Sequence, residues 1–405
     1  MLQTLQPTVE PVTAQPARTW HVITCEYPPQ SGGVSDYTIL VAKGLASLGD
    51  EVHIWCPALP AKAPEIRGVQ VHAVLGKFSP RDLRNAGREL DRLPGPRHLL
   101  VQWVPHGFGY KSMNLAFCLW LWGRSKLRHD QVDVMVHEPF LQFLPGRWRQ
   151  NAAAAVHRLM TLVLLGAAHD VSLSTPTWEQ MLRPFDLGRQ RDYKWLPLPS
   201  NVPIEKDAGG IAAIQEQYAG PGLLLGHFGT FNPAITPMLS AIVPALLRRS
   251  NGSSLLLIGG GGPAFRERLI RECPDLEGRV HAVGQIDARD PRLSWHLSAC
   301  DALLQPYPDG VTTRRTTVMA ALAHGLATIT TSGELTEPLW SKSGAVVMAP
   351  ADDSEAFVEA ALGILESVEK RASLGQNGRK FYQRNFDIRH IVELLRGSGE
   401  RPTEL

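Results

Sequence analysis

The residues best suited to bind an anion lie in one polar loop, which reads Pro-Tyr-Pro-Asp-Gly-Val-Thr-Thr-Arg-Arg-Thr-Thr over residues 306–317. The loop follows an expected strand ending at Gln305 and leads into a helix of small residues. Hydroxyls, guanidinium groups and the free N–H groups of a helix start all donate to phosphate oxygens. We therefore predict a diphosphate site at Thr312, Thr313, Arg314 and Arg315. The alternative is a capped helix with two solvated arginines, but cations at a helix start are unfavourable without a bound anion.

Two glycine-rich turns stand at similar places, between a strand and a helix. The first contains Gly32 and Gly33, and the second reads Gly-Gly-Gly-Gly over residues 259–262. Glycine lets backbone N–H groups approach a ligand closely, and a helix N-terminus favours negative charge. Gly32 and Gly33 are therefore predicted to contact a phosphate, with a flexible turn as the alternative. Neither turn is a GxGxxG or P-loop motif, so no nicotinamide cofactor is indicated.

His137 and Glu138 end an expected strand, residues 132–136, that should be buried on both faces. This position should point His137 into a cleft, where an imidazole can hydrogen-bond a sugar hydroxyl or a developing charge. We predict His137 as the catalytic residue, with Glu138 beside it. A buried structural histidine is the alternative.

Metal and cofactor signals are absent from the sequence. No Asp-x-Asp motif is present, and the five cysteines have neither zinc-site nor redox-pair spacing. Scattered reduced thiols fit a cytoplasmic protein. We therefore expect no metal and no cofactor.

These residues need a scaffold, and the apolar pattern supplies one. Strands are expected at 21–24, 52–55, 69–74, 99–104, 132–136, 171–174, 223–227, 255–258, 280–283, 302–305, 328–330 and 345–348, with helices between them. Such alternation predicts parallel sheets covered by helices on both faces. The proline-rich run 195–203 reads as a linker, so the fold class is α/β with two doubly wound, Rossmann-like domains facing each other across a cleft.

The expected limits are a disordered tail over 1–18, an N-terminal domain over 19–200, a C-terminal domain over 201–368, and helices over 369–405 that pack back towards the N-terminal domain. The tail lacks an apolar run and is not a signal peptide. A formal net charge of +2 gives no case for nucleic acid. No stretch is long enough for a membrane span. The apolar run 115–122, flanked by cations, is either a buried helix or a peripheral membrane contact.

From about His21 to Leu395, the chain resembles a retaining glycosyltransferase of the GT-B fold, of the family 4 (glycosyl transferases group 1) type. The resemblance rests on the order of several loose motifs: Tyr27-Pro-Pro with Gly32-Gly33-Val34, Val136-His137-Glu138, Gly226-His-Phe-Gly-Thr230, Cys300–Pro306, Ala321–Thr330 and the Glu337-Pro338 pair. It implies a nucleoside diphosphate sugar as co-substrate, transfer with retention, and a role in polysaccharide or glycoconjugate synthesis. The acceptor would be a glycan, a lipid or a small molecule. The implied donor-binding residues are Gly229, Thr230, Gly260, Gly284, Asp309, Gly310 and Glu337.

The donor loop departs from the family pattern of two glutamates. Thr312 and Ala320 stand where the glutamates are usual, and no Arg or Lys follows Thr230 closely. Two other functions therefore stay open: a sugar-nucleotide epimerase or hydrolase of the same fold, using Glu26, Asp36 or Glu138, and a non-catalytic nucleotide-sugar-binding relative.

Overall fold

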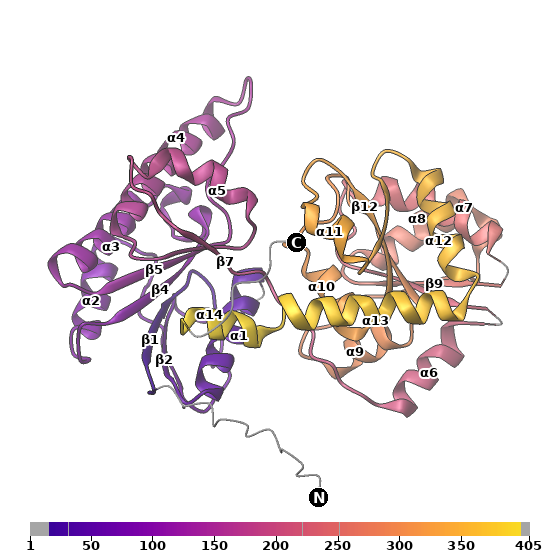
Figure 1. Ribbon diagram of the computed structural model, residues 1–405, viewed down its shortest axis with the longest axis horizontal. Helices are drawn as coiled ribbons and strands as arrows, with labels where there is room; N and C mark the ends of the chain where they lie inside the picture. Colours follow the sequence, from indigo (N-terminus) through magenta and orange to yellow (C-terminus); the bar gives the residue numbers. More distant parts are fainter. Residues whose placement is uncertain (1–15, 31, 221, 251, 398–405) are drawn as a thin grey trace, which may run out of the picture.

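The computed structural model describes residues 16–30, 32–220, 222–250 and 252–397. They form two α/β halves, each built on one parallel sheet (Figure 1). The predicted fold class is confirmed. The predicted tail lies outside the described residues, except for residues 16–18.

The first sheet has the order β3-β2-β1-β4-β5-β6-β7, and all neighbouring strands are parallel. Its strands are β1 (Thr19–Ile23), β2 (Glu51–Trp55), β3 (Val69–His72), β4 (His98–Trp103), β5 (Gln131–Val136), β6 (Val171–Leu173) and β7 (Tyr193–Trp195). The sequence pattern did not predict β7, because its three residues, Tyr-Lys-Trp, lack an apolar run and adjoin the proline-rich segment.

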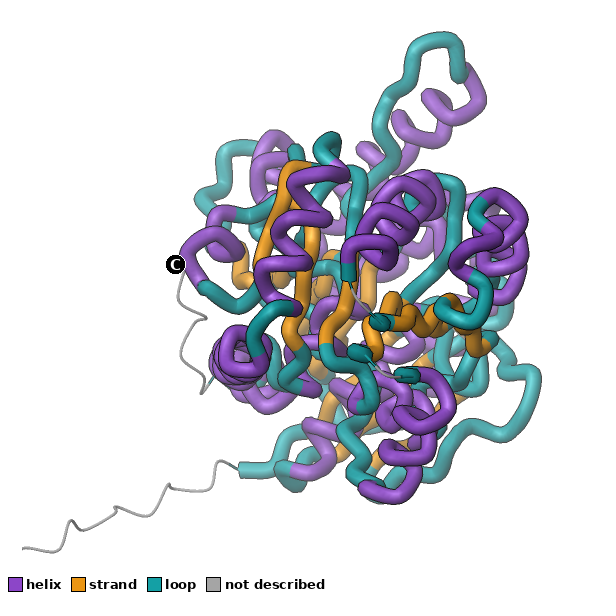
Figure 2. Tube along the Cα trace, turned by 90° about the vertical axis from the view of Figure 1, so that its right-hand side faces the viewer, coloured by secondary structure: helices purple, strands orange, loops and turns teal. Residues whose placement is uncertain are grey.

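The second sheet has the order β10-β9-β8-β11-β12-β13, again parallel throughout. Its strands are β8 (Leu224–Phe228), β9 (Ser254–Ile258), β10 (Val280–Val283), β11 (Ala302–Gln305), β12 (Ala327–Ser332) and β13 (Val347–Pro350). Every residue of β9 and β11 is buried, as expected for strands covered on both faces. Figure 2 shows helices on both sides of these strands.

Helices fill most of the connections between strands. They are α1 (Gly33–Ser47), α2 (Pro80–Leu90), α3 (Leu115–Leu127), α4 (Trp148–Ala167), α5 (Thr177–Leu182), α6 (Ala208–Tyr218), α7 (Thr236–Arg249), α8 (Gly262–Glu272), α9 (Pro291–Ser298), α10 (Thr316–His324), α11 (Pro338–Ser343), α12 (Ser354–Leu365), α13 (Val368–Asn385) and α14 (Ile388–Leu395). The first turns of α4 project beyond the body of the first half (Figures 1 and 2). None of the helices in the described ranges is long and apolar enough to cross a membrane.

The end of the chain joins the two halves. Helix α13 packs against α10 and β12 of the second half, whereas α14 packs against α1 of the first. Ile391 and Val392 share a core with Tyr37 and Val41 of α1. Gly44 permits this close approach, because a Cβ there would lie 2.5 Å from the Val392 side chain. The exact domain limits given above stay predictions.

Candidate active site

Two adjoining cavities lie between the halves, at the carboxyl ends of strands from both sheets. The N-side cavity, about 440 Å³, is lined by the segments after β1, β4 and β5 together with Arg314. The C-side cavity, about 410 Å³, is lined by the segments after β8, β9 and β10. Both cavities share five residues: Gly32, Gly33, Asp36, Asn201 and Thr316. The cavities are therefore two ends of one cleft.

His137 lies at the end of β5 and lines the N-side cavity, as predicted from its place in the sequence. Its Nε2 lies 2.8 Å from Gln102 Oε1, and its ring meets that of Tyr37 edge-on at 4.9 Å. Since an amide oxygen only accepts, Nε2 carries the proton and Nδ1 is left as an acceptor. Burial, with a smaller effect of the Arg314 charge, lowers the pKa of His137 to about 3. The imidazole is therefore a neutral hydrogen-bonding group at physiological pH.

We expect the pH profile of turnover to show no loss of activity caused by His137 between pH 5 and 8, because its pKa lies below this range. Protonation should affect stability instead. The unfolded chain gains a proton near pH 6.5, but the folded chain does so only near pH 3, so this residue lowers stability as the pH falls through that window. The test is kcat against pH for the wild type and His137→Gln. A fall near pH 6.5 that the variant abolishes would contradict the assignment.

The N-terminus of α1 is occupied by a side chain of the protein itself. Glu26 Oε1 accepts hydrogen bonds from the N–H groups of Val34 and Ser35, each at 3.0 Å. Gly32 makes room for this carboxylate, since a Cβ there would lie 2.1 Å from Glu26 Oε1. Gly32 and Gly33 line both cavities. Their contact with a phosphate stays a prediction, and it would have to use groups other than these two N–H donors.

The glycines of the second half shape the C-side cavity. Gly259 has a φ of 136°, and a Cβ there would lie 2.1 Å from the carbonyl oxygen of Gly229. The turns after β8 and β9 can therefore pack this closely only because residue 259 is a glycine. Gly229, Thr230 and Gly260 line the cavity. Gly284 is not among its lining residues, although the segment directly after it, 285–289, is.

The predicted diphosphate loop is held at Thr313 by Glu337. Thr312 and Thr313 are buried, and Thr313 donates to Glu337 through both its N–H, at 3.1 Å, and its hydroxyl, at 2.8 Å. Glu337 also accepts hydrogen bonds from Thr175 of the first half and from the Trp340 indole. The carboxylate therefore holds the loop in place. Phosphate binding by Thr312 and Thr313 stays a prediction that would require these contacts to rearrange.

The two arginines of the loop point to different partners. Arg315 pairs with Asp309 and lies over the Tyr307 ring at 4.5 Å, while Gly310 turns the loop with a φ of 85°. Arg314 instead crosses to the first half, where it lies 3.7 Å from Glu138 and 4.8 Å from the Trp178 ring centroid. Of the two, Arg314 lines the N-side cavity. Its charge therefore lies beside His137 and Glu138.

Sequence reasoning did not select several residues at the junction of the cavities. Asp36 accepts a hydrogen bond from Asn201 at 2.8 Å, and burial raises the pKa of its carboxyl above the usual value. Thr316 and Thr317, at the start of α10, line the C-side cavity. Asp36 was considered only for an epimerase or hydrolase. Asp36 follows the first glycine turn and lies in the first turn of α1. This spacing could have indicated that Asp36 lies at the cleft.

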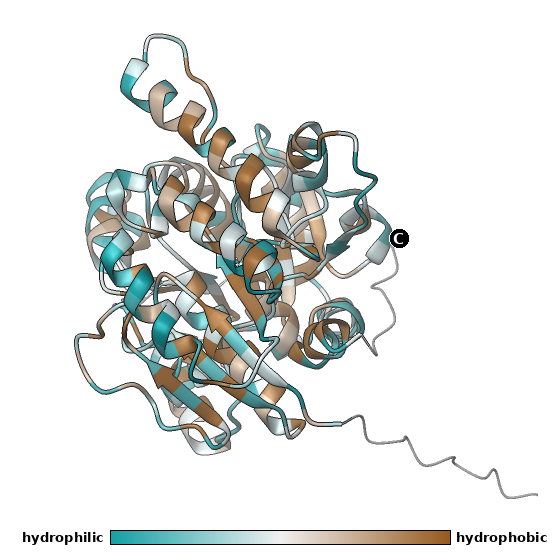
Figure 3. Cartoon of the chain, turned by 90° about the vertical axis from the view of Figure 1, so that its left-hand side faces the viewer, coloured by the Kyte–Doolittle hydropathy of each residue, from teal (hydrophilic) through white to brown (hydrophobic). Residues whose placement is uncertain are grey.

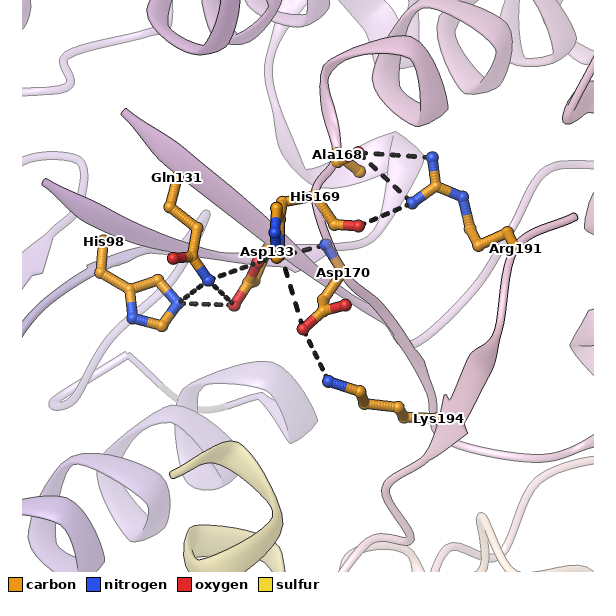
Figure 4. A network of polar contacts seen from close by, with 8 residues as sticks. All are labelled: His98, Gln131, Asp133, Ala168, His169, Asp170, Arg191 and Lys194. Atoms are coloured by element: carbon orange, nitrogen blue, oxygen red, sulfur yellow. Dashed lines mark hydrogen bonds and ion pairs between the residues drawn. The ribbon is translucent and has the colours of Figure 1, made fainter. Parts of the chain in front are cut away.

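One further group of titratable residues lies towards the amino ends of β5 and β6, away from the cavities. Asp133, His169 and Asp170 bring their ligand atoms close together (Figure 4). Asp133 is also paired with His98, and Asp170 with Lys194 at 2.6 Å. Side chains from β4 and β7 thus already partner the carboxylates, which makes this a polar network between neighbouring segments of the first sheet.

The fold and its cleft define a class of protein. Among solved structures, the chain is similar to sucrose-phosphate synthase from Thermosynechococcus elongatus, with a TM-score of 0.67, 18% identity, and coverage of 94% of this chain and 98% of that one. It is also similar to Anabaena Alr3699/HepE in complex with UDP-glucose, with a TM-score of 0.63, 15% identity, and coverage of 94% and 98%. The chain therefore has the GT-B fold of glycosyltransferases.

The sequence comparisons narrow this class. Residues 222–367 match the family model of glycosyl transferases group 1. The whole chain is 22% identical over 397 residues to a phosphatidyl-myo-inositol mannosyltransferase of Mycolicibacterium smegmatis, covering 91% of this chain and 92% of the relative. The second half is thus a glycosyl transferases group 1 domain, and the protein is a GT-B glycosyltransferase. The resemblance seen in the sequence is confirmed for the GT-B fold and the group 1 domain.

Proposed function

We propose that the protein transfers a sugar from a nucleoside diphosphate sugar in the C-side cavity to an acceptor in the N-side cavity. The observation that carries this proposal is the junction of the two cavities at Asp36, Asn201 and Thr316. A donor and an acceptor bound at the two ends would meet there, and holding two reactants together is itself a large part of catalysis. A structural neighbour, Anabaena Alr3699/HepE, was solved in complex with UDP and with UDP-glucose, which supports this kind of donor.

We propose that Arg314 stabilises the leaving diphosphate. Its guanidinium is only about one-third exposed and lies on the acceptor side of the loop, next to Thr316 at the start of α10. A fixed cation in a partly dry cleft stabilises charge that develops as the glycosidic bond breaks. Arg315, already paired with Asp309, would contribute through the loop rather than directly. Retention is carried from the resemblance: the acceptor would attack from the face that the leaving group departs, with a phosphate oxygen taking its proton.

A turnover assay tests the proposed function. The protein would be incubated with ¹³C-labelled UDP-glucose or GDP-mannose, together with either a lipid extract or a soluble small-molecule extract as the acceptor source. We expect release of the nucleoside diphosphate that depends on one extract, and a new glycoside with the anomeric configuration of the donor. Free sugar alone would indicate a hydrolase and a free epimer an epimerase, and either would contradict the proposal. Inversion would contradict retention only.

The arginines should differ in their effect on nucleotide affinity. We expect Arg314→Ala to weaken nucleoside diphosphate binding at least about tenfold, because a hydrogen bond to a charged group contributes roughly 1.5–3 kcal/mol. Arg315→Ala should weaken it less, and Arg189→Ala, at an exposed position of the first half, should not change it. Calorimetric titration of the three variants provides the measurement. Equal affinities for the wild type and Arg314→Ala would remove Arg314 from the donor site.

A further inference from the structure

Two long stretches of the first half contain no acidic residue. The chain has 39 Asp and Glu among 405 residues, yet none occurs from residue 92 to 129 or from 139 to 169. These stretches include α3 and α4, which pack side by side (Figure 1). The outer surface of this helix pair therefore has no acidic residue of its own.

The outward faces of both helices are apolar. On α3, Leu119 and Trp122 are 52% and 42% exposed and lie one turn apart, while Phe117, Cys118 and Leu121 face the core. On α4, the exposed positions Trp148, Ala152, Ala155 and Leu159 recur at helical spacing. The two faces adjoin at Gly166, where a Cβ would lie 3.8 Å from the Trp122 ring, an ordinary packing distance. The run 115–122 is thus buried on one side only. The sequence had allowed either a buried helix or a peripheral membrane contact, and the structure shows a helix with one buried and one exposed face.

The projecting start of α4 is an apolar tip, which we define as residues 140–149. Phe143 is 51% exposed and Trp148 is 72% exposed. Arg158 of α4 packs against the tip, with its guanidinium 4.4 Å from the Phe140 ring centroid and 4.0 Å from that of Phe143. The Asn151 side chain fixes the turn at Leu144, because its Oδ1 accepts from the Leu144 N–H and its Nδ2 donates to the Leu144 carbonyl oxygen. The aromatic side chains are therefore held outward by specific contacts.

Cations surround these apolar faces. Arg147 and Arg149 are exposed at the tip, and Lys126 and Arg128 are exposed at the far end of α3. Figure 3 shows hydrophobic residues along the projecting α4. Exposed aromatic and aliphatic side chains rimmed by Lys and Arg are the features of protein surfaces that lie in the interface of an anionic bilayer.

We propose that the α3–α4 face, comprising the tip, Leu159, Leu119 and Trp122, docks this protein onto an anionic lipid bilayer. Aromatic side chains would enter the boundary between headgroups and acyl chains, while Arg147, Arg149 and Lys126 pair with lipid phosphates. Arg128 lies 3.7 Å from Asp91 and is already paired. A second copy of the chain is a poorer occupant, because a two-fold contact through this face would bring cations against cations with no carboxylate of either stretch between them.

The docking has a consequence for the cleft. The segment after β5 leads to the tip, and the segment after β4 leads to the exposed Tyr110. Both segments begin at residues that line the N-side cavity, among them His106, Gly107 and Glu138. A docked protein would hold this end of the cleft near the headgroups. The docking itself does not depend on the proposed transfer, and it can be tested without turnover.

Vesicle co-sedimentation tests the proposal. We expect the full chain to sediment with vesicles of 70% phosphatidylcholine and 30% phosphatidylglycerol, to bind pure phosphatidylcholine at least tenfold more weakly, and to dissociate as salt is raised. The double variant Phe143→Ser/Trp148→Ser and the charge variant Arg147→Glu/Arg149→Glu should each bind the anionic vesicles at least tenfold more weakly. Val368→Ser, at a position 66% exposed on α13, serves as the matched control and should bind as the wild type does.

Melting temperatures of all variants establish that they are folded, which is expected because the substituted side chains are exposed. Wild-type protein that stays in the supernatant with anionic vesicles would overturn the proposal, as would variants that sediment like the wild type. Sedimentation velocity gives a further outcome. A wild-type dimer that Phe143→Ser/Trp148→Ser converts to a monomer would assign this face to self-association and contradict lipid docking.

Discussion

Replacing His137 by alanine is expected to lower kcat about 100-fold or more, the usual scale for a positioned catalytic side chain. The structure places the ring on the N-side cavity, fixed through Gln102 and Tyr37, and its low pKa keeps it neutral. A neutral imidazole lowers the barrier only if its hydrogen bond to the sugar tightens in the transition state. Nucleoside diphosphate affinity should change little, because His137 is neutral and offers the diphosphate no charge, unlike Arg314.

A matched variant separates this effect from loss of a buried side chain. His157 is also fully buried, but it bonds the Ser112 carbonyl oxygen under the start of α3, away from the cleft. His157→Gln should lower the melting temperature and leave kcat close to that of the wild type. Turnover, affinity and melting temperature would be measured on both variants. If His137→Ala keeps its turnover, or loses affinity and stability together with it, His137 is a structural residue.

Removing the carboxylate of Glu337 should have the largest effect on stability. Glu337→Ala leaves four buried donors without their acceptor: the N–H and the hydroxyl of Thr313, the hydroxyl of Thr175 and the Trp340 indole. Each unsatisfied buried donor costs roughly 1–3 kcal/mol, so we expect a loss of at least about 3 kcal/mol. For a domain of this size, this corresponds to a fall in melting temperature of roughly 6–12 °C.

The same variant should also weaken donor binding, because Thr313 is adjacent to Arg314 in the loop that Glu337 holds. We expect the KM for the nucleotide sugar to rise about tenfold or more. Among the donors to Glu337, Thr175→Val removes only the one from the first half, together with the long contacts of this hydroxyl to Thr177 at 3.4 Å. It should therefore cost about 1 kcal/mol and leave the loop in place. A melting curve for Glu337→Ala that overlays the wild type, or an unchanged KM, would show that this carboxylate does not organise the site.

The sequence was sufficient for the parts of the fold that local patterns control. Apolar runs separated by helical spacing gave most of the strands within a few residues, and the end of β5 put His137 at the cleft. The glycine turns after β1 and β9, which the residues themselves indicated, line the cavities, and Gly229 after β8, which the resemblance implied, lines the C-side cavity. In each case the feature follows from a few neighbouring residues and the geometry of a parallel sheet.

Contacts between distant segments could not be predicted in this way. Glu337 reaches Thr313 across 24 residues and Thr175 across 162, so no local pattern indicates that it holds the donor loop. Arg314 and Arg315 are neighbours with the same charge, yet one meets Glu138 and the other Asp309. Glu26 fills the helix start that the sequence offered to a phosphate. Side-chain partners of this kind depend on how the two halves face each other.

The most direct test of the account is a calorimetric titration of nucleoside diphosphates into the wild type and a variant with a charge placed in the C-side cavity. Thr230 lines this cavity and is exposed, so Thr230→Asp would set a carboxylate against the diphosphate without disturbing the core. Ser341→Asp, at an exposed position on α11, is the control for added charge. We expect at least one nucleoside diphosphate to bind the wild type and Ser341→Asp equally, and to bind Thr230→Asp at least tenfold more weakly. Equal affinity in all three proteins, or no binding of any nucleoside diphosphate to the wild type, would contradict a donor site in this cleft.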